Sequence, residues 1–250
     1  MVNPLLLHTN NDIPFVAGRC AIHNPTIKEI SLIGEEDFQK GVRFLNFNKN
    51  NLDEKDKIHL SDKSDFEILI EIMKSKEYYT TFTSKSLLAL SLLFPLCEVQ
   101  LKEDSIQLTN KENGFITKID KNSYEEFKQI IIEIFVLESN DEEGNGNYNP
   151  ADGLAAKIAQ KIKDGQKKRG KQKDAENILK KKSIYGKMVS VLSVGLGKDK
   201  NELLNYTIYQ LLDEYKRFQL KNAYDINIKA RLAGATDIDD PEDWLEDLLL

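Results

Sequence analysis

The sequence predicts an α+β protein: an N-terminal mixed domain with a small antiparallel sheet covered by helices, then an all-α C-terminal domain. Residues 1–138 combine helical apolar stripes with short alternating segments, which is typical of a mixed domain. Residues 139–152 carry no large aliphatic side chain, and the stripes that follow in residues 153–250 are helical. The chain has 250 residues, of which 40% are hydrophobic, so it can bury a sizeable core.

Capping signals and periodicity predict three helices early in the N-terminal domain. Asn24-Pro25 provides a cap and a first-turn proline before an apolar stripe that ends at Gly34. Ser64 and Glu67 fit a capping box before a second stripe, and Pro95 ends a third apolar segment. The expected helices span residues 25–33, 64–73 and 87–94.

A meander of three short strands is expected next. Apolar and polar residues alternate in two segments, and Asn113-Gly114 predicts a tight turn into a third. Ser123 and Glu126 fit the capping box of a helix whose apolar stripe would cover this sheet. The expected strands span residues 99–101, 106–108 and 115–119, and the expected helix spans residues 123–137.

Residues 139–152 are expected to form a flexible linker, because Gly, Asn and acidic residues cannot bury enough surface to order themselves. Beyond the linker, Asp199 and Glu202 fit a capping box, and Gly234 fits a helix end. Apolar residues repeat at helical spacing in four stretches, and Asp240-Pro241 begins a further short helix that carries Trp244. The four stretches are residues 154–162, residues 184–192, residues 208–218 and a separate helix over residues 224–232.

Charge is strongly polarised along the chain. The basic segment, residues 154–187, holds twelve basic and three acidic residues in a chain whose net charge is −6. The tail, residues 236–250, is acidic and contains the single tryptophan, Trp244. Such blocks are usually solvated faces or interaction segments, so self-association and docking on a charged surface are both compatible with this pattern.

The cysteine and histidine residues do not predict an enzyme. Cys20 and His23 have half of a zinc-ligand spacing, but His8, His59 and Cys97 supply no second pair. Cys97 and a distant histidine could be assigned as a nucleophile and its general base, but no neighbouring residue in the sequence would activate either group. We therefore expect no catalytic residues, no metal and no cofactor.

Residues 141–152 partly match a calcium-binding loop, in which oxygen ligands recur at fixed positions around a glycine. The match is weakened by Pro150 inside the loop and by an aspartate where a bidentate glutamate is usual. A solvated linker is the simpler interpretation, although calcium binding stays open. The matching residues are Asp141, Glu143, Asn145, Gly146 and Asp152.

Two further patterns suggest phosphate or nucleic-acid binding only weakly. Gly195-Leu-Gly197-Lys198 resembles the end of a phosphate loop, but the first glycine is missing and Asp199 stands where a hydroxyl must meet Mg²⁺. A turn that ends a helix explains it better. Residues 163–182 could neutralise phosphates, but all of their basic residues except Arg169 are lysines. Nucleic-acid binding is therefore a minor alternative.

Several segments resemble a group of tailed-bacteriophage proteins from the tail-assembly region. They span both expected domains and end in a Trp-containing acidic stretch, without a catalytic signature. In order, they are Ile22-His-Asn-Pro-Thr-Ile-Lys-Glu-Ile30 with Ile33-Gly34-Glu35, Phe66-Glu-Ile-Leu-Ile-Glu-Ile72, Tyr185-Gly-Lys-Met-Val-Ser-Val-Leu192, Leu203 to Phe218, Ala223-Tyr224, Arg231-Leu-Ala-Gly-Ala-Thr-Asp237 and Asp243-Trp244-Leu-Glu-Asp-Leu248.

The resemblance implies a non-enzymatic tail assembly chaperone that binds the tape-measure protein, the tail-tube protein or both. A minor tail or baseplate component of the virion is the alternative. We expect a protein of the host cytoplasm, or of the virion tail, with no membrane association. A partner helix would bind in an apolar groove, although core packing is an alternative role for the same side chains. The expected partner-binding residues are Tyr206, Tyr209, Tyr215, Phe218, Trp244, Leu245 and Leu248.

Overall fold

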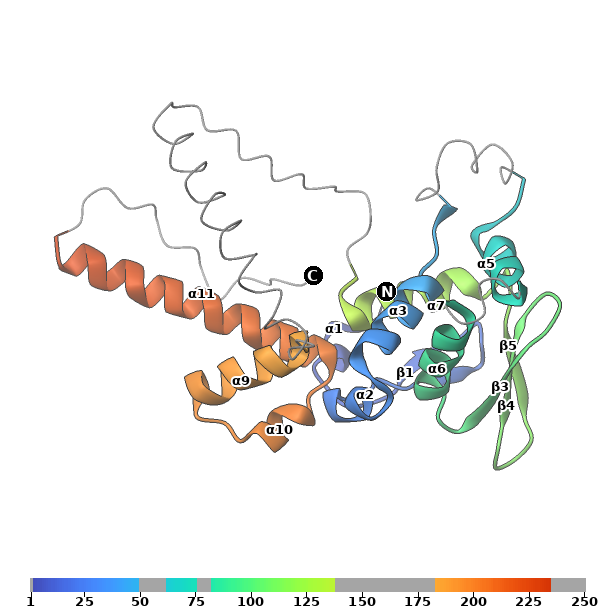
Figure 1. Ribbon diagram of the computed structural model, residues 1–250, viewed down its shortest axis with the longest axis horizontal. Helices are drawn as coiled ribbons and strands as arrows, with labels where there is room; N and C mark the ends of the chain where they lie inside the picture. The colour runs from blue at the N-terminus through green and yellow to red at the C-terminus, as the bar shows by residue number, and fades with distance from the viewer. Residues whose placement is uncertain (1, 50–61, 76–81, 138–182, 235–250) are drawn as a thin grey trace, which may run out of the picture. The chain divides into compact units, whose positions relative to one another are not determined.

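The structure is a computed structural model that describes residues 2–49, 62–75, 82–137 and 183–234 (Figure 1). Two small antiparallel sheets combine with helices, so the predicted α+β class is confirmed. The elements are α1 Pro4–Leu7, β1 Ile13–Phe15, β2 Cys20–Ile22, α2 Ile27–Ile33, α3 Glu35–Leu45, α5 Asp65–Lys74, α6 Ser84–Leu93, β3 Cys97–Leu101, β4 Ile106–Asn110, β5 Ile116–Ile119, α7 Tyr124–Phe135, α9 Ile184–Leu196, α10 Lys200–Leu204 and α11 Ile208–Leu232.

Within the described ranges, residues 2–137 and residues 188–234 belong to one compact unit. The described helices that follow residue 188 therefore share a unit with the mixed N-terminal part. The linker expected over residues 139–152 lies outside the described residues, so the predicted domain boundary stays a prediction.

The predicted meander is present as β3, β4 and β5. Leu108 of β4 pairs with Val99 on one side and with Thr117 on the other, in antiparallel register. Ile106 and Leu108 alternate with half-buried polar residues and are themselves fully buried. This sheet therefore turns one apolar face toward the core, as alternation predicts.

The β1–β2 hairpin was not among the elements predicted from the sequence. Phe15 pairs with Cys20, and the turn between them holds Arg19 at a φ of 53°. Positive φ is uncommon for a residue other than glycine, and Arg is not among the residues enriched there. No turn signal such as Asn-Gly marks this hairpin in the sequence.

The helices of the N-terminal part pack closely against one another and against the β1–β2 hairpin. Gly41 of α3 lies against the backbone of α6, since a Cβ atom there would stand 2.2 Å from the Lys85 carbonyl oxygen. In α7, the buried Phe127 ring lies 5.9 Å from the Phe15 ring, so this helix covers the hairpin. The buried Tyr124 hydroxyl donates to the Leu45 carbonyl oxygen at 2.9 Å, which joins α7 to α3.

Two of the predicted N-terminal caps differ from the structure. The capping box of α2 is formed by Thr26 and Glu29, so the prediction that Asn24 caps this helix is wrong. The buried Asn24 amide instead donates to the Thr9 carbonyl oxygen. The predicted capping box at Ser123 is also wrong, because Glu126 accepts backbone N–H groups from the hairpin turn, more than 100 residues away.

The capping box of α5 is confirmed, with Ser64 and Glu67 bonded reciprocally. Near the C-terminus, α11 is one helix of 25 residues, so the separate helix predicted over residues 224–232 is wrong. Residues 219–223 contain neither glycine nor proline, and nothing there stops a helix from continuing. Among the described residues, no helix is both long enough and apolar enough to span a bilayer.

Candidate functional site

The C-terminal helices are anchored to the N-terminal part by two helix starts that meet. Thr26 and Thr207, the N-caps of α2 and α11, form an isolated antiparallel bridge. Beside it, the Ile27 N–H donates to the Tyr206 carbonyl oxygen at 2.9 Å. Each N-cap carries its own capping box, so the N–H groups of Thr26, Glu29, Thr207 and Gln210 all find acceptors at this junction.

Tyr209, an expected partner-binding residue, is part of this junction. Its side chain is 3% exposed, and its ring meets the His8 ring edge to face at 4.9 Å. The neighbouring Gln210 donates from Nε2 to the His8 carbonyl oxygen at 2.7 Å. Tyr209 therefore packs inside the protein and stabilises the contact between α11 and the N-terminal residues.

Tyr206, a second expected partner-binding residue, takes part in a polar cluster. The Lys198 ammonium donates to the Tyr206 hydroxyl at 2.6 Å and to the Glu214 carboxylate at 3.3 Å. The hydrogen bond to Tyr206, supported by Glu214, raises the pKa of Lys198 above its ordinary value, so Lys198 stays charged. The glycine-containing loop after α9, considered above for phosphate binding, is fixed by this cluster to α11.

Tyr215 and Phe218 are half-buried on α11. The Phe218 ring lies over Gly195 of α9, where an added Cβ atom would stand 2.2 Å from Phe218 Cζ. Gly195 is therefore needed for the close approach of these two helices. The expected residues Trp244, Leu245 and Leu248 lie outside the described residues.

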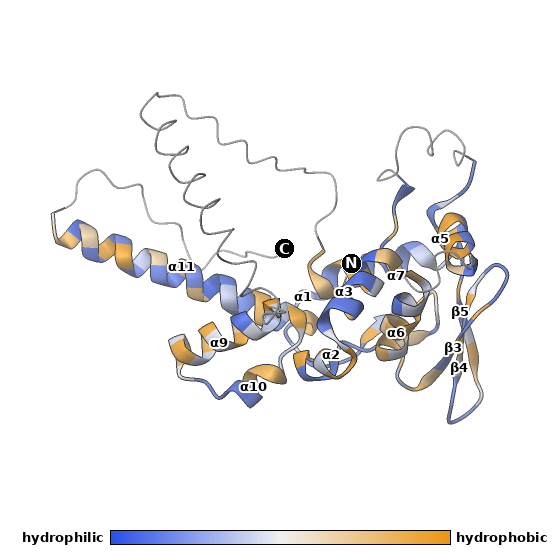
Figure 2. Ribbon diagram, viewed as in Figure 1, coloured by the Kyte–Doolittle hydropathy of each residue, from blue (hydrophilic) through white to orange (hydrophobic). Residues whose placement is uncertain are grey.

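One side of the apolar helix α9 is exposed, a feature that the sequence pattern did not predict. Val189 and Leu192 are buried, whereas Val194 is 86% exposed, and Val191 and Leu196 are 39% exposed. Val194 follows Leu192 by two residues, which places it about 200° around the helix. Figure 2 shows α9 largely in orange, while α11 carries hydrophilic and hydrophobic residues in alternation. A helix that is apolar on both faces and exposed on one is typical of a protein-binding element.

The cysteine and histidine candidates lie near one another without forming a metal centre. Cys20, His23 and Cys97 line one pocket, but His23 is held between the carboxylates of Asp12 at 2.8 Å and Glu29 at 3.2 Å. Burial is the main cause that raises the pKa of Cys20 to about 11, and burial also raises the pKa of Cys97. Neutral thiols are poor nucleophiles. In the described part of the chain, no group of three or more His, Cys, Asp or Glu side chains could hold a metal ion.

The calcium-loop candidate at residues 141–152, the lysine-rich residues 163–182 and the helices expected over residues 154–162 and after Asp240 lie outside the described residues. Their predicted structures and roles therefore stay predictions.

The described residues thus form an α+β body, to which α11 is joined at the Thr26–Thr207 bridge. Residues 181–248 match the family model described as the YomV second domain, a family derived from Bacillus phages and prophages. No curated protein and no solved structure matches the chain. The match includes the described helices α9, α10 and α11. It supports a phage-related protein, which is the broader part of the resemblance described above.

Proposed function

We propose that the protein is a non-enzymatic tail assembly chaperone of a phage or prophage that binds the tape-measure protein, the tail-tube protein or both. The similarity of residues 181–248 to a phage-derived domain supports the phage context. The resemblance of segments in both halves of the chain to tail-region proteins supports the role in tail assembly.

The exposed apolar face of α9 is the observation that carries this proposal. Val191 and Val194 lie three residues apart, and so on one side of α9, within the matched residues, and they are accessible to a partner. Their exposure has an energetic cost of about 25 cal/mol for each Å² left in water, which a partner that covers them would recover. A long apolar helix, such as a tape-measure protein supplies, is the partner chemistry that fits an apolar helical face.

The expected aromatic residues contribute in two ways under this proposal. Tyr206 and Tyr209 stabilise the junction that holds α11 in place. Phe218 packs against Gly195 of α9 and so positions the exposed face, whereas Tyr215 is half-buried on α11. Trp244, with the leucines of the acidic tail, stays a predicted partner contact.

Co-expression of the full chain with tail proteins of the same phage or prophage tests the proposal. A tape-measure fragment and the tail-tube protein are each co-expressed with the tagged chain, and complexes are measured by size-exclusion chromatography. We expect at least one stable complex, and absence of the chain from purified virions. If neither protein associates, the proposal is wrong. Recovery of the chain in finished virions would instead assign a structural tail component.

A further inference from the structure

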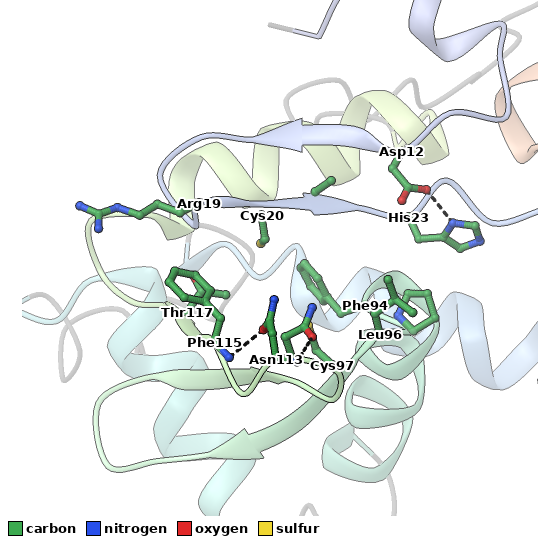
Figure 3. Close-up of a pocket in the computed structure, with 13 residues that line it drawn as sticks. Asp12, Arg19, Cys20, His23, Phe94, Leu96, Cys97, Asn113, Phe115 and Thr117 are labelled. Atoms are coloured by element: carbon green, nitrogen blue, oxygen red, sulfur yellow. Dashed lines mark hydrogen bonds and ion pairs between the residues drawn. The ribbon is translucent and has the colours of Figure 1, made fainter.

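A pocket of about 340 Å³ lies between the β1–β2 hairpin, the C-terminal end of α6 and the turn that joins β4 to β5 (Figure 3). Phe94, Leu96 and Phe115 give it an apolar lining. Leu96 is 56% exposed and Phe115 is 53% exposed, so both stand at its mouth. The pocket is therefore open to a partner and offers apolar contact at its entrance.

Two asparagine side chains present amide donors to this pocket. Asn110 Oδ1 accepts the backbone N–H groups of Glu112 at 2.9 Å and Asn113 at 3.2 Å, and Asn113 Oδ1 accepts the N–H of Phe115 at 2.9 Å. Because each oxygen is engaged by the turn, the orientation of both amides is fixed. Figure 3 shows the Asn113 amide nitrogen directed into the pocket. Among the described residues, neither amide nitrogen has an acceptor.

The free edge of β2 adds a backbone donor and a backbone acceptor. Ala21 lines the pocket and is paired with Pro14, which has no N–H group. The His23 N–H donates to the Leu93 carbonyl oxygen, away from β1. Since alternate residues of a strand direct their backbone groups to the same edge, the Ala21 N–H and C=O also face away from β1. Within the described ranges, no hydrogen bond uses them.

The Asn110 and Asn113 amides are the side-chain donors that this lining leaves without an acceptor in the described residues, and the charged side chains do not compete with them. Arg19 lines the pocket, but Figure 3 shows the Arg19 guanidinium directed away from it. Asp12, an acidic residue of the lining, is engaged by His23 at 2.8 Å. The thiols of Cys20 and Cys97 add no negative charge, because burial raises the pKa of both. The pocket is therefore suited to a ligand that carries an anionic acceptor.

We propose that this pocket binds an extended acidic peptide segment of a partner polypeptide. A carboxylate accepts hydrogen bonds from the Asn110 and Asn113 amides, and an adjacent apolar side chain packs against Leu96 and Phe115. The partner backbone pairs with Ala21, whose N–H and C=O lie on one edge. An extended peptide supplies the side chains for the pocket and the backbone groups for Ala21 at the same time, which is the basis of recognition by strand addition. This inference is separate from the proposed function, because its site lies on β2 and the β4–β5 turn rather than on α9.

Titration of the ¹⁵N-labelled full chain with two synthetic peptides tests the inference. The probes are acetyl-Val-Glu-Leu-amide and its neutral match, acetyl-Val-Gln-Leu-amide. We expect the glutamate peptide to shift the Asn110 and Asn113 side-chain signals and the Ala21 N–H signal, with an affinity about tenfold higher than the glutamine peptide. If these signals do not move at about 10 mM glutamate peptide, where a millimolar complex would be mostly formed, the inference is wrong. Equal binding of both peptides also overturns it.

Conservative variants separate binding from folding. Asn110→Asp and Asn113→Asp keep the oxygen that accepts from the turn, but each removes the amide donor and adds a negative charge. Asn3→Asp is the matched control, because Asn3 Oδ1 caps α1 by accepting from the Leu5 N–H at 3.0 Å and does not line the pocket. We expect each pocket variant to weaken glutamate-peptide binding by at least about tenfold, and the control to leave it unchanged.

Far-UV circular dichroism establishes that each variant is folded. If one pocket variant does not fold, the other provides the comparison. The comparison of the glutamate and glutamine peptides uses the wild-type chain and therefore does not depend on any variant. A folded Asn113→Asp chain that binds the glutamate peptide as tightly as wild type would refute the inference. The test uses only this chain and synthetic peptides, so its failure leaves the proposed tail function untouched.

Discussion

Replacing Thr207 with alanine is expected to destabilise the unit in which α2 and α11 meet. The Thr207 side chain is 0% exposed, and its hydroxyl oxygen accepts the Gln210 N–H at 3.3 Å. In return, Gln210 Oε1 accepts the Thr207 N–H at 2.9 Å. Loss of an N-cap threonine typically costs about 1 kcal/mol, and burial of one methyl group contributes about 0.8 kcal/mol. Thr207→Ala should therefore lower the free energy of unfolding by about 2 kcal/mol.

Thr207→Ser provides the matched control, because it keeps the capping hydroxyl and removes only the methyl group. We expect this variant to lose about 0.8 kcal/mol, so the two variants should differ by about 1 kcal/mol, the contribution of the cap. Urea unfolding followed by circular dichroism measures both values. For a chain of this size, the difference corresponds to about 2–4 °C in Tm. Equal stability of the two variants would show that the Thr207 cap does not hold the junction.

Three further predictions follow from individual contacts. Gly195→Ala should lower the free energy of unfolding by about 1–3 kcal/mol, because the new Cβ meets the Phe218 ring. In a double-mutant cycle, Phe218→Ala should relieve this cost, and additive effects of the two substitutions would contradict the contact. Hydrogen bonds from the Ser64 backbone and side chain lower the pKa of Glu67 to about 2, so its carboxylate stabilises the fold above an unfolded pKa of about 4.3, and this contribution is lost as the pH falls toward 2. Glu67→Gln should therefore lose less stability than wild type between neutral pH and pH of about 3, measured by urea unfolding, and identical pH profiles would refute the assignment. Burial raises the pKa of Cys20 to about 11, so iodoacetamide should label it slowly at neutral pH and faster as the pH rises or in urea; rapid labelling of the folded chain would contradict the burial.

Local patterns in the sequence were sufficient for several elements. Ser64 and Glu67 lie one helical turn apart, so their capping box depends on no distant residue, and the structure contains it. Asn113-Gly114 likewise marks the turn before β5, where Gly114 adopts a φ of 69°. These elements were predictable because their stabilising contacts lie within a few residues.

Elements that depend on distant contacts were not predictable in the same way. Glu126 fits a capping box by spacing, but it accepts from the Val16 and Ala17 N–H groups, and no local signal reveals that partner. Thr26 and Glu29 also fit a capping box, so the cap of α2 could have been found in the sequence. It was missed because Asn24-Pro25 offered a competing start.

The candidate site was only partly predictable. Tyr209 has the helical spacing of a surface anchor, but the distant His8 ring covers it. The exposure of Val194 depends on which face of α9 meets α11, and the sequence shows only that both faces are apolar. The roles of Asn110 and Asn113 could not be predicted either. A turn signal predicts the geometry of the backbone, but it does not predict which pocket the side-chain amides face.

The affinity of the tape-measure protein for the Val194→Asn variant tests the central claim most directly. Val194 is 86% exposed on α9, so the substitution should remove a partner contact and leave the fold intact. Val16→Asn is the matched control, because Val16 is 75% exposed outside the matched helices. With isothermal titration calorimetry we expect Val194→Asn to weaken binding by about tenfold and Val16→Asn to bind like wild type. Equal affinities for wild type and Val194→Asn would contradict the proposal that α9 binds the partner.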